Sequence, residues 1–136
     1  MKQKLTARDV LAAAQEERET ILAHRRTIHR CPEVGQDLPR TAAYIAGELK
    51  KLGYQPRALG GGLMATITGK DTGRCVLLRA DMDALAGREQ SGLDFQSDNG
   101  AMHACGHDMH AAMLLGAAAL LRKYQAQLNE IGRAHV

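Results

Sequence analysis

The sequence predicts a single α/β domain. Two long segments, 6–29 and 107–128, carry apolar residues at helical spacing, and the short apolar run Cys75–Leu78 lies between them. A chain of 136 residues with 45% hydrophobic and 24% charged residues is typical of one globular domain with a modest core. Helices that alternate with a buried strand favour the α/β class.

The first helix is expected over 6–29, because Thr6 and Asp9 have the spacing of a capping box. A proline and a glycine follow the segment and end the helical pattern. His24 and His29 lie on this helix and are not expected to be metal ligands. One helical face is apolar and comprises Val10, Ala14, Ile21 and Ile28.

A second helix is expected to begin near Pro39, a favoured first-turn residue, and to stop at Gly53. Gly60–Gly62 lacks the spacing and the following helix of a nucleotide-binding loop, so it is interpreted as a turn before a strand over 63–68. Cys75–Leu78 is apolar at every position, which is typical of a strand buried on both faces. Its cysteine is therefore expected to lie in the core.

Residues 86–101 are expected to form a polar loop, and a last helix is expected over 107–128. The segment Ala111–Leu121 is apolar on nearly all faces, so this helix is expected to be buried, but it is too short to span a bilayer. The first residues carry lysines rather than an apolar run. We therefore expect no signal peptide and a cytoplasmic location.

The composition excludes several classes of partner. The net charge of +3 is small and its acids and bases are interspersed, so neither nucleic acid nor an anionic membrane is an expected partner. Aromatic residues make up only 3%, which argues against stacking on single-stranded nucleic acid. Three cysteines without a CxxC pair favour free thiols or a metal ligand over a disulfide framework.

The block Met102–His110 is rich in metal-binding side chains. Imidazole, thiolate and carboxylate groups bind zinc, manganese and related ions. Gly106 lets the backbone bend so that Cys105 and His107 can face one ion, and the start of a helix favours the thiolate. The alternative is a buried apolar cysteine among surface histidines. A single cysteine or histidine would favour that alternative. A Cys-x-His pair flanked by two more histidines favours metal binding instead.

Asp81 and Asp83 lie just beyond the predicted strand Cys75–Leu78. Their spacing on an extended segment places both carboxylates on one face, at the sheet edge where ligands gather in α/β proteins. Two such carboxylates repel each other unless a cation lies beside them. A solvated strand end, or pairing with Arg79 or Arg88, explains the spacing equally well.

These blocks match a known family. Arg79–Leu85 and Met102–His110, followed by Leu114–Ala118, strongly resemble the metal-dependent amidohydrolases of the aminoacylase type. That zinc-peptidase-like group includes hippurate hydrolases, N-acyl-amino-acid amidohydrolases and auxin-conjugate hydrolases. His29–Gly35 and Arg40–Ala42 are similar to the amino-terminal signature of the family.

The resemblance covers nearly all of 23–128. It implies a partial three-layer catalytic domain, with a mixed central sheet flanked by helices, and a smaller lid or dimerisation domain through which the intact parent can form a homodimer. It also implies hydrolysis of N-acyl amino acids or related small amides by two divalent ions, manganese or zinc. By this resemblance the metal ligands are Cys105 and His107, the catalytic residue is Asp83, and the supporting motif residues are Asp81, His103, Asp108 and His110.

The chain departs from the family in places. Cys31 stands where the family often has a histidine, and Ala86 stands where it usually has a proline. Family members are much longer, and their remaining metal ligands and general-base glutamate lie in parts that this chain does not contain.

The last residues, Ile131–Val136, resemble the translation of a sequencing-library adapter. We therefore expect 1–129 to be the amino-terminal part of the catalytic domain, truncated before the lid, and 130–136 to be a non-native tail. Such a chain is expected to lack amidase activity. The alternative is a short, non-catalytic metal-binding or interaction protein that retains the motif.

Overall fold

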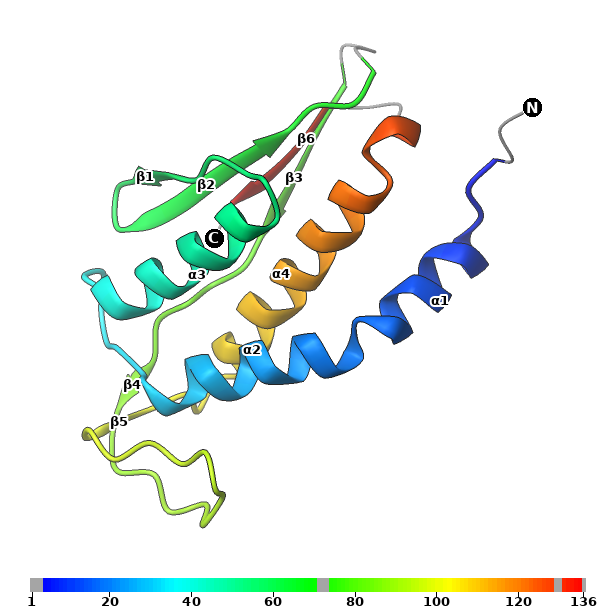
Figure 1. The fold of residues 1–136 in the computed structure, drawn as a ribbon. Helices are drawn as coiled ribbons and strands as arrows, with labels where there is room; N and C mark the ends of the chain where they lie inside the picture. The colour runs from blue at the N-terminus through cyan, green and yellow to red at the C-terminus, as the bar shows by residue number, and fades with distance from the viewer. Residues whose placement is uncertain (1–3, 71–73, 129–130, 136) are drawn as a thin grey trace.

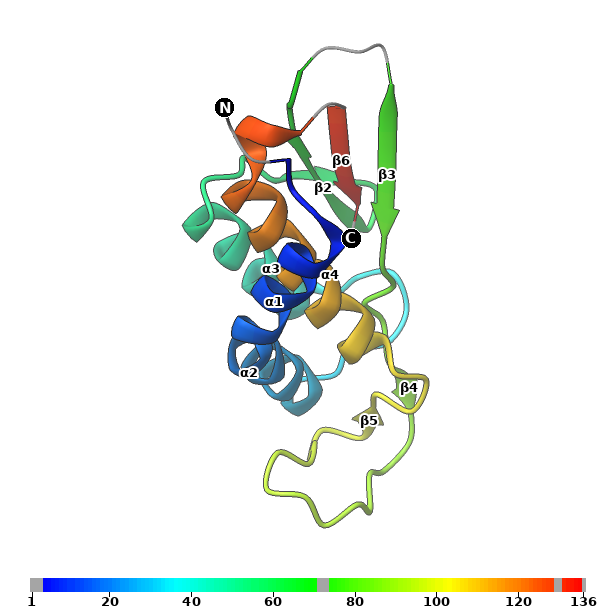
Figure 2. The same cartoon turned by 90° about the vertical axis from the view of Figure 1, so that its right-hand side faces the viewer.

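The computed structural model describes residues 4–70, 74–128 and 131–135. Its helices pack on one side of a sheet, as two views at right angles show (Figures 1 and 2). The α/β class is confirmed. Within the described residues two layers of the expected three are present, because no helix lies on the other side of the sheet.

The sheet is mixed, as expected. Its strands are Arg57–Leu59 (β1), Gly62–Ile67 (β2), Cys75–Arg79 (β3) and Ile131–His135 (β6). They are arranged in the order β1-β2-β6-β3, with antiparallel pairs except for the parallel pair of β6 and β3. The predicted glycine turn joins β1 to β2. The predicted turn after β2 includes residues 71–73, which lie outside the described residues.

The segment expected to be a non-native tail forms strand β6, which lies between β2 and β3. In the register of the sheet, Ile131 is the partner of Cys75, and His135 is the partner of Met64. The non-native origin of 130–136 stays a prediction, and residues 130 and 136 lie outside the described residues.

The first helical segment is two helices, Ala7–Glu16 (α1) and Arg18–Arg30 (α2), so the prediction of one continuous helix is wrong. The break is at Glu17, whose ψ of −2° departs from that of an α-helix. Both helices contact α4, and the bend lets each follow its surface (Figure 1). The capping box of Thr6 and Asp9 is confirmed.

The two remaining helices begin at the residues that the sequence predicts. Pro39–Lys51 (α3) begins at the predicted proline, and His107–Lys123 (α4) is followed by a 3₁₀ turn over Gln125–Gln127 (η1). The last helix therefore ends earlier than predicted. None of the described helices is long and apolar enough to cross a membrane.

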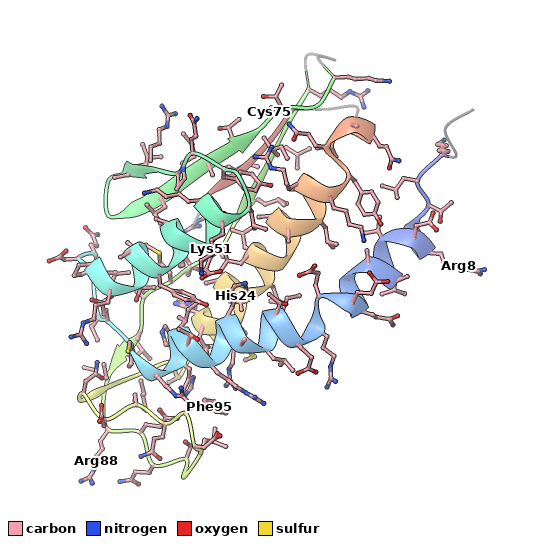
Figure 3. The ribbon with its side chains drawn as sticks, in the orientation of Figure 1. Arg8, His24, Lys51, Cys75, Arg88 and Phe95 are labelled. Atoms are coloured by element: carbon pink, nitrogen blue, oxygen red, sulfur yellow. The ribbon has the colours of Figure 1, made fainter. Side chains whose placement is uncertain are left out.

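The predicted burial of β3 is wrong. Cys75, Val76 and Leu77 are exposed, and Leu78 alone of this strand packs against the core. The physical reason is position: β3 is at the sheet edge, and within the described residues it pairs with β6 alone. Cys75, labelled in Figure 3, is therefore a surface thiol.

The core lies between the sheet and helices α2, α3 and α4. Ile45, Leu49, Ile67 and Leu115 are its largest fully buried apolar side chains. Helices α2 and α4 approach closely at Gly116, where an added Cβ would lie 2.6 Å from Cδ1 of Ile21. This approach brings α2 beside the start of α4, where the predicted metal-binding block ends.

Truncating the core is expected to destabilise the chain far more than truncating its surface. Leu49→Ala removes a side chain that is 2% exposed and should lower the free energy of unfolding by about 2–5 kcal/mol. The same change at Leu11, which is 60% exposed, should alter it by less than about 0.5 kcal/mol. Urea denaturation followed by circular dichroism measures both values. Equal losses would contradict the described core.

The predicted loop 86–101 is present. Two short strands, Leu85–Ala86 (β4) and Ala101–Met102 (β5), pair antiparallel and close it. The backbone N–H of Ala84 donates to the carbonyl of Glu33 at 2.8 Å, which fixes the start of β4 against the segment after α2. The loop therefore leaves and re-enters the fold beside the start of α4.

Candidate metal centre

His107 is held by Asp83 across the end of β3. Its Nδ1 lies 2.8 Å from Oδ1 of Asp83 and 3.0 Å from the backbone carbonyl oxygen of the same residue. Both oxygens are acceptors, so we assign the proton of the imidazole to Nδ1. The lone pair is then on Nε2, which is the state in which a histidine binds a metal ion.

Asp81 approaches the other nitrogen of this ring. Its Oδ2 lies 4.0 Å from Nε2 of His107, while its Oδ1 accepts a hydrogen bond from Nη2 of Arg79 at 3.0 Å. The pairing with Arg79 that was one explanation of the sequence is therefore present. It engages one carboxylate oxygen and leaves the second one facing His107.

His110 completes a cluster on α4. It follows His107 by one helical turn, and the centroids of the two rings are 5.5 Å apart. One potential ligand atom each from Asp81, His107 and His110 lies within 4.8 Å of the others. Two imidazoles and a carboxylate suit zinc and manganese, so the residues present fit a divalent ion.

Cys105 lies outside this cluster of three donors. Its side chain is exposed, so the alternative interpretation as a buried apolar residue is wrong. The glycine that follows, Gly106, has a φ of +80°, a left-handed conformation that few other residues adopt. The bend expected between Cys105 and His107 is therefore present, and the role of the thiol as a ligand stays a prediction.

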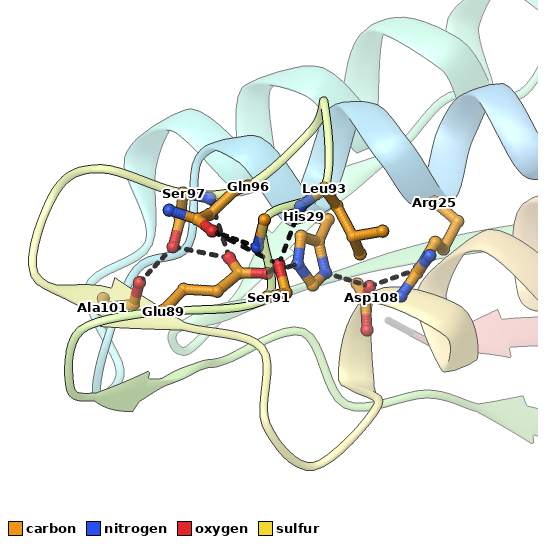
Figure 4. A network of polar contacts seen from close by, with 10 residues as sticks. Arg25, His29, Glu89, Ser91, Leu93, Gln96, Ser97, Ala101 and Asp108 are labelled. Atoms are coloured by element: carbon orange, nitrogen blue, oxygen red, sulfur yellow. Dashed lines mark hydrogen bonds and ion pairs between the residues drawn. The ribbon is translucent and has the colours of Figure 1, made fainter.

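A buried polar network joins helix α2, the loop and the first turn of α4, beside His107 in the sequence (Figure 4). Nδ1 of His29 lies 2.7 Å from Oδ2 of Asp108, and its Nε2 lies 2.7 Å from Oε1 of Glu89. Both partners are carboxylates that can only accept, so both ring nitrogens donate and the imidazole carries a positive charge. Arg25 also donates from Nε to Oδ2 of Asp108 at 2.8 Å.

The carboxylates of this network are held in their charged form. Burial alone would raise the pKa of Glu89, but hydrogen bonds from His29, Ser97 and Ser91 outweigh it and lower the pKa to about 2. Burial likewise opposes ionisation of Asp108, and hydrogen bonds from His29 and Arg25 lower its pKa below the ordinary value. Positive and negative groups thus alternate along the network, in the order Arg25, Asp108, His29 and Glu89.

Phe95, labelled in Figure 3, belongs to the loop, and its aromatic ring packs against the network. Its centroid lies 5.3 Å from that of the His29 ring and 4.8 Å from Cζ of Arg25. Because Asp108 directly follows His107, the network fixes the first turn of α4 against α2 and the loop. The network therefore restrains the position of His107, which directly precedes Asp108 in the sequence.

His103 is buried beside this network, and its ring centroid lies 6.2 Å from that of His29. Neither of its ring nitrogens has a hydrogen-bond partner within the described part of the chain. Burial lowers the pKa of His103, which favours the neutral ring. No hydrogen bond joins His103 to the cluster within the described residues, and its supporting role stays a prediction.

Sequence reasoning missed His29, Arg25 and Glu89. His29 opens the segment His29–Gly35, which is similar to the amino-terminal signature of the family, and that similarity is a signal that could have marked it as more than a helix residue. Glu89 sits in the polar loop, where no local pattern distinguishes a buried carboxylate from a solvated one.

The pKa of Glu89 makes a prediction about acid stability. Because its folded pKa of about 2 is below the ordinary 4.5, its contribution is fully present above about pH 4.5 and is lost as the pH falls towards 2. Glu89→Gln should therefore be less stable than the parent at pH 7 and should lose less stability between pH 5 and 3. Urea denaturation across this range measures the difference. The exposed Glu19→Gln is the control, and a slope unchanged in Glu89→Gln would contradict the prediction.

The profile of peptidase family M20/M25/M40 matches residues 77–135, which contain the whole cluster. The N-acetyl-L-cysteine deacetylase of Bacillus subtilis is 45% identical over 112 residues, which are 80% of this chain and 27% of that protein. The N-acyl-L-amino acid amidohydrolase of Geobacillus stearothermophilus is 38% identical over 128 residues, covering 92% of this chain and 35% of the relative.

The fold is also similar to that of solved structures. The YXEP protein of Bacillus subtilis, described as a dinuclear metal-binding peptidase, superposes with a TM-score of 0.83 at 34% identity. The match covers 89% of this chain and 35% of that one. This chain thus spans about a third of the length of the proteins that it resembles.

Proposed function

Because this chain belongs to peptidase family M20/M25/M40, we propose that it is the amino-terminal part of a metal-dependent amidohydrolase for N-acyl amino acids or related small amides. The observation that carries the proposal is the imidazole of His107. Asp83 holds its Nδ1, and its Nε2 faces Asp81 beyond the end of β3. The names of the relatives support the substrate class.

In this proposal Cys105 and His107 are ligands of a centre that takes two divalent ions, manganese or zinc. When bound, such ions polarise an amide carbonyl and activate a water molecule. Asp83 keeps the proton of His107 on Nδ1. An open cavity of about 290 Å³ beside Asp81 and Asp83 gives a small amide room to approach.

Asp108, one of the remaining motif residues, acts by positioning. Asp108 ties the first turn of α4 to His29 and Arg25, so His107 keeps its place relative to β3. Asp81 and His110 lie beside His107, and the buried His103 lies beside His29. We also propose that the intact parent forms a homodimer.

Residues 1–136 alone should not turn over substrate. The described residues hold one cluster of three donors, whereas a binuclear centre and its general base need more groups than these. A non-catalytic metal-binding protein is the second candidate, and the same self-contained cluster favours it. The reading frame that follows residue 129 in the gene distinguishes the two candidates.

The test compares two chains. One is residues 1–136, and the other continues in the genomic reading frame to the length of the relatives. Both are assayed for hydrolysis of N-acetyl amino acids and hippurate with added Mn²⁺ or Zn²⁺. We expect turnover by the longer chain alone, lost on chelation and in His107→Ala. A longer chain without metal-dependent hydrolysis of any N-acyl amino acid, or a genuine stop codon, would contradict the proposal.

A further inference from the structure

We infer that Asp81, His107 and His110 together hold one divalent ion in this chain, without the thiol of Cys105. The inference rests on the proposed function only for the expectation that the chain binds such an ion. The family resemblance makes one of these three residues, His107, a ligand. The structure adds an aspartate from the end of β3 and a histidine from the exposed side of α4.

The ligand atom of His107 is defined by its surroundings. Nδ1 is occupied by the carboxylate and the carbonyl of Asp83, so Nε2 is the nitrogen with a free lone pair. Nε2 faces the cluster, where Oδ2 of Asp81 lies 4.0 Å away. A carboxylate behind a histidine is a common support for metal binding, because it fixes the tautomer and makes the ring a stronger ligand.

Asp81 supplies the oxygen. Arg79 anchors its Oδ1 at 3.0 Å, which restrains the carboxylate and turns Oδ2 towards His107. Ligands of a tetrahedral zinc ion lie about 3.4 Å apart at ordinary bond lengths. The donor atoms lie within 4.8 Å of one another, so a contraction of up to about 1.4 Å forms the site, and small rotations of the half-buried Asp81 and the exposed His110 supply it.

His110 supplies the third donor. It is exposed, and its ring lies beside that of His107 at a centroid separation of 5.5 Å. Local charge favours a cation: Asp81 and Asp83 outweigh Arg79, and the charges of His29, Arg25, Glu89 and Asp108 behind the cluster balance one another. An open cavity of about 470 Å³, lined by Asp81 and His110, leaves space for the remaining water or substrate ligands.

Cys105 is exposed and lies outside the group whose ligand atoms converge. Its thiol is available to a second ion in a completed binuclear centre. A single ion in this chain already has three donors without Cys105, namely Asp81, His107 and His110.

The test is Co²⁺ binding to the full 136-residue chain carrying Cys31→Ser and Cys75→Ser, so that Cys105 is its one remaining cysteine. Calorimetry gives affinity and stoichiometry, and absorption reports the ligands, because a thiolate ligand produces a charge-transfer band in the near ultraviolet. We expect one ion per chain and no such band. His110→Ala and Asp81→Asn should each weaken binding about tenfold or more, whereas Cys105→Ser should leave it unchanged.

Met109→Ala, an exposed change between the two histidines, is the matched control and should also bind as the parent does. His110→Gln and circular dichroism separate a lost ligand from a disturbed helix. A charge-transfer band that disappears in Cys105→Ser, with normal binding in His110→Ala, would overturn the inference, as would the absence of binding. Hydrolysis by the longer chain tests the proposed function separately, since it can succeed with either ligand set.

Discussion

Asp108→Ala is expected to lower the free energy of unfolding by about 3–5 kcal/mol, because it removes one of the two carboxylates that pair with the buried His29 and the carboxylate that pairs with Arg25. Asp108 is 1% exposed and accepts hydrogen bonds from His29 and Arg25 at 2.7 and 2.8 Å. It also lies in the first turn of α4, where a negative charge interacts favourably with the helix dipole. Urea denaturation at pH 7 measures the loss.

The matched control is Asp94→Ala, which removes an exposed aspartate from the loop and should change stability by less than about 0.5 kcal/mol. Asp108→Asn keeps the shape of the side chain and removes its charge, so its loss should fall between the two. An Asp108→Ala variant as stable as Asp94→Ala would show that the network does not hold α4 in place.

Asp83→Ala is expected to weaken Co²⁺ binding about 10–100-fold without unfolding the chain. Its carboxylate, which is 43% exposed, holds the proton of His107 on Nδ1 and so keeps Nε2 free for the ion. Without it, the imidazole can rotate and exchange its tautomer. Calorimetric titration measures the affinity, and circular dichroism checks the fold.

Asp83→Asn provides the comparison, because its amide oxygen still accepts from Nδ1 although the charge is lost. Its affinity should lie between those of the parent and Asp83→Ala. Equal binding by all three proteins would mean that Asp83 does not orient His107, and the candidate centre would lose its main support.

Local signals predicted the parts of the fold that local interactions determine. The capping box at Thr6, the proline at the start of α3 and the glycine turn before β2 each act within a few residues, and each is present. The burial of β3 depends instead on which strands and helices lie beside it. An apolar run alone could not show that Val76 and Leu77 lie at an exposed edge.

The same distinction applies to the site. Asp81, Asp83, His107 and His110 come from two short blocks whose residue types indicated metal chemistry, and the fold brings them together. His29 bonds to Glu89 and Asp108, which are 60 and 79 residues away in the sequence. Such pairings depend on the packing of α2 against α4, so the sequence of either segment alone could not predict them.

The most direct test of the metal centre is anomalous scattering from crystals of the chain grown with Co²⁺. We expect a peak at about 2.0–2.2 Å from Nε2 of His107, with Asp81 and His110 also coordinating the ion. A cobalt peak away from His107, or one at Cys105 alone, would contradict this expectation.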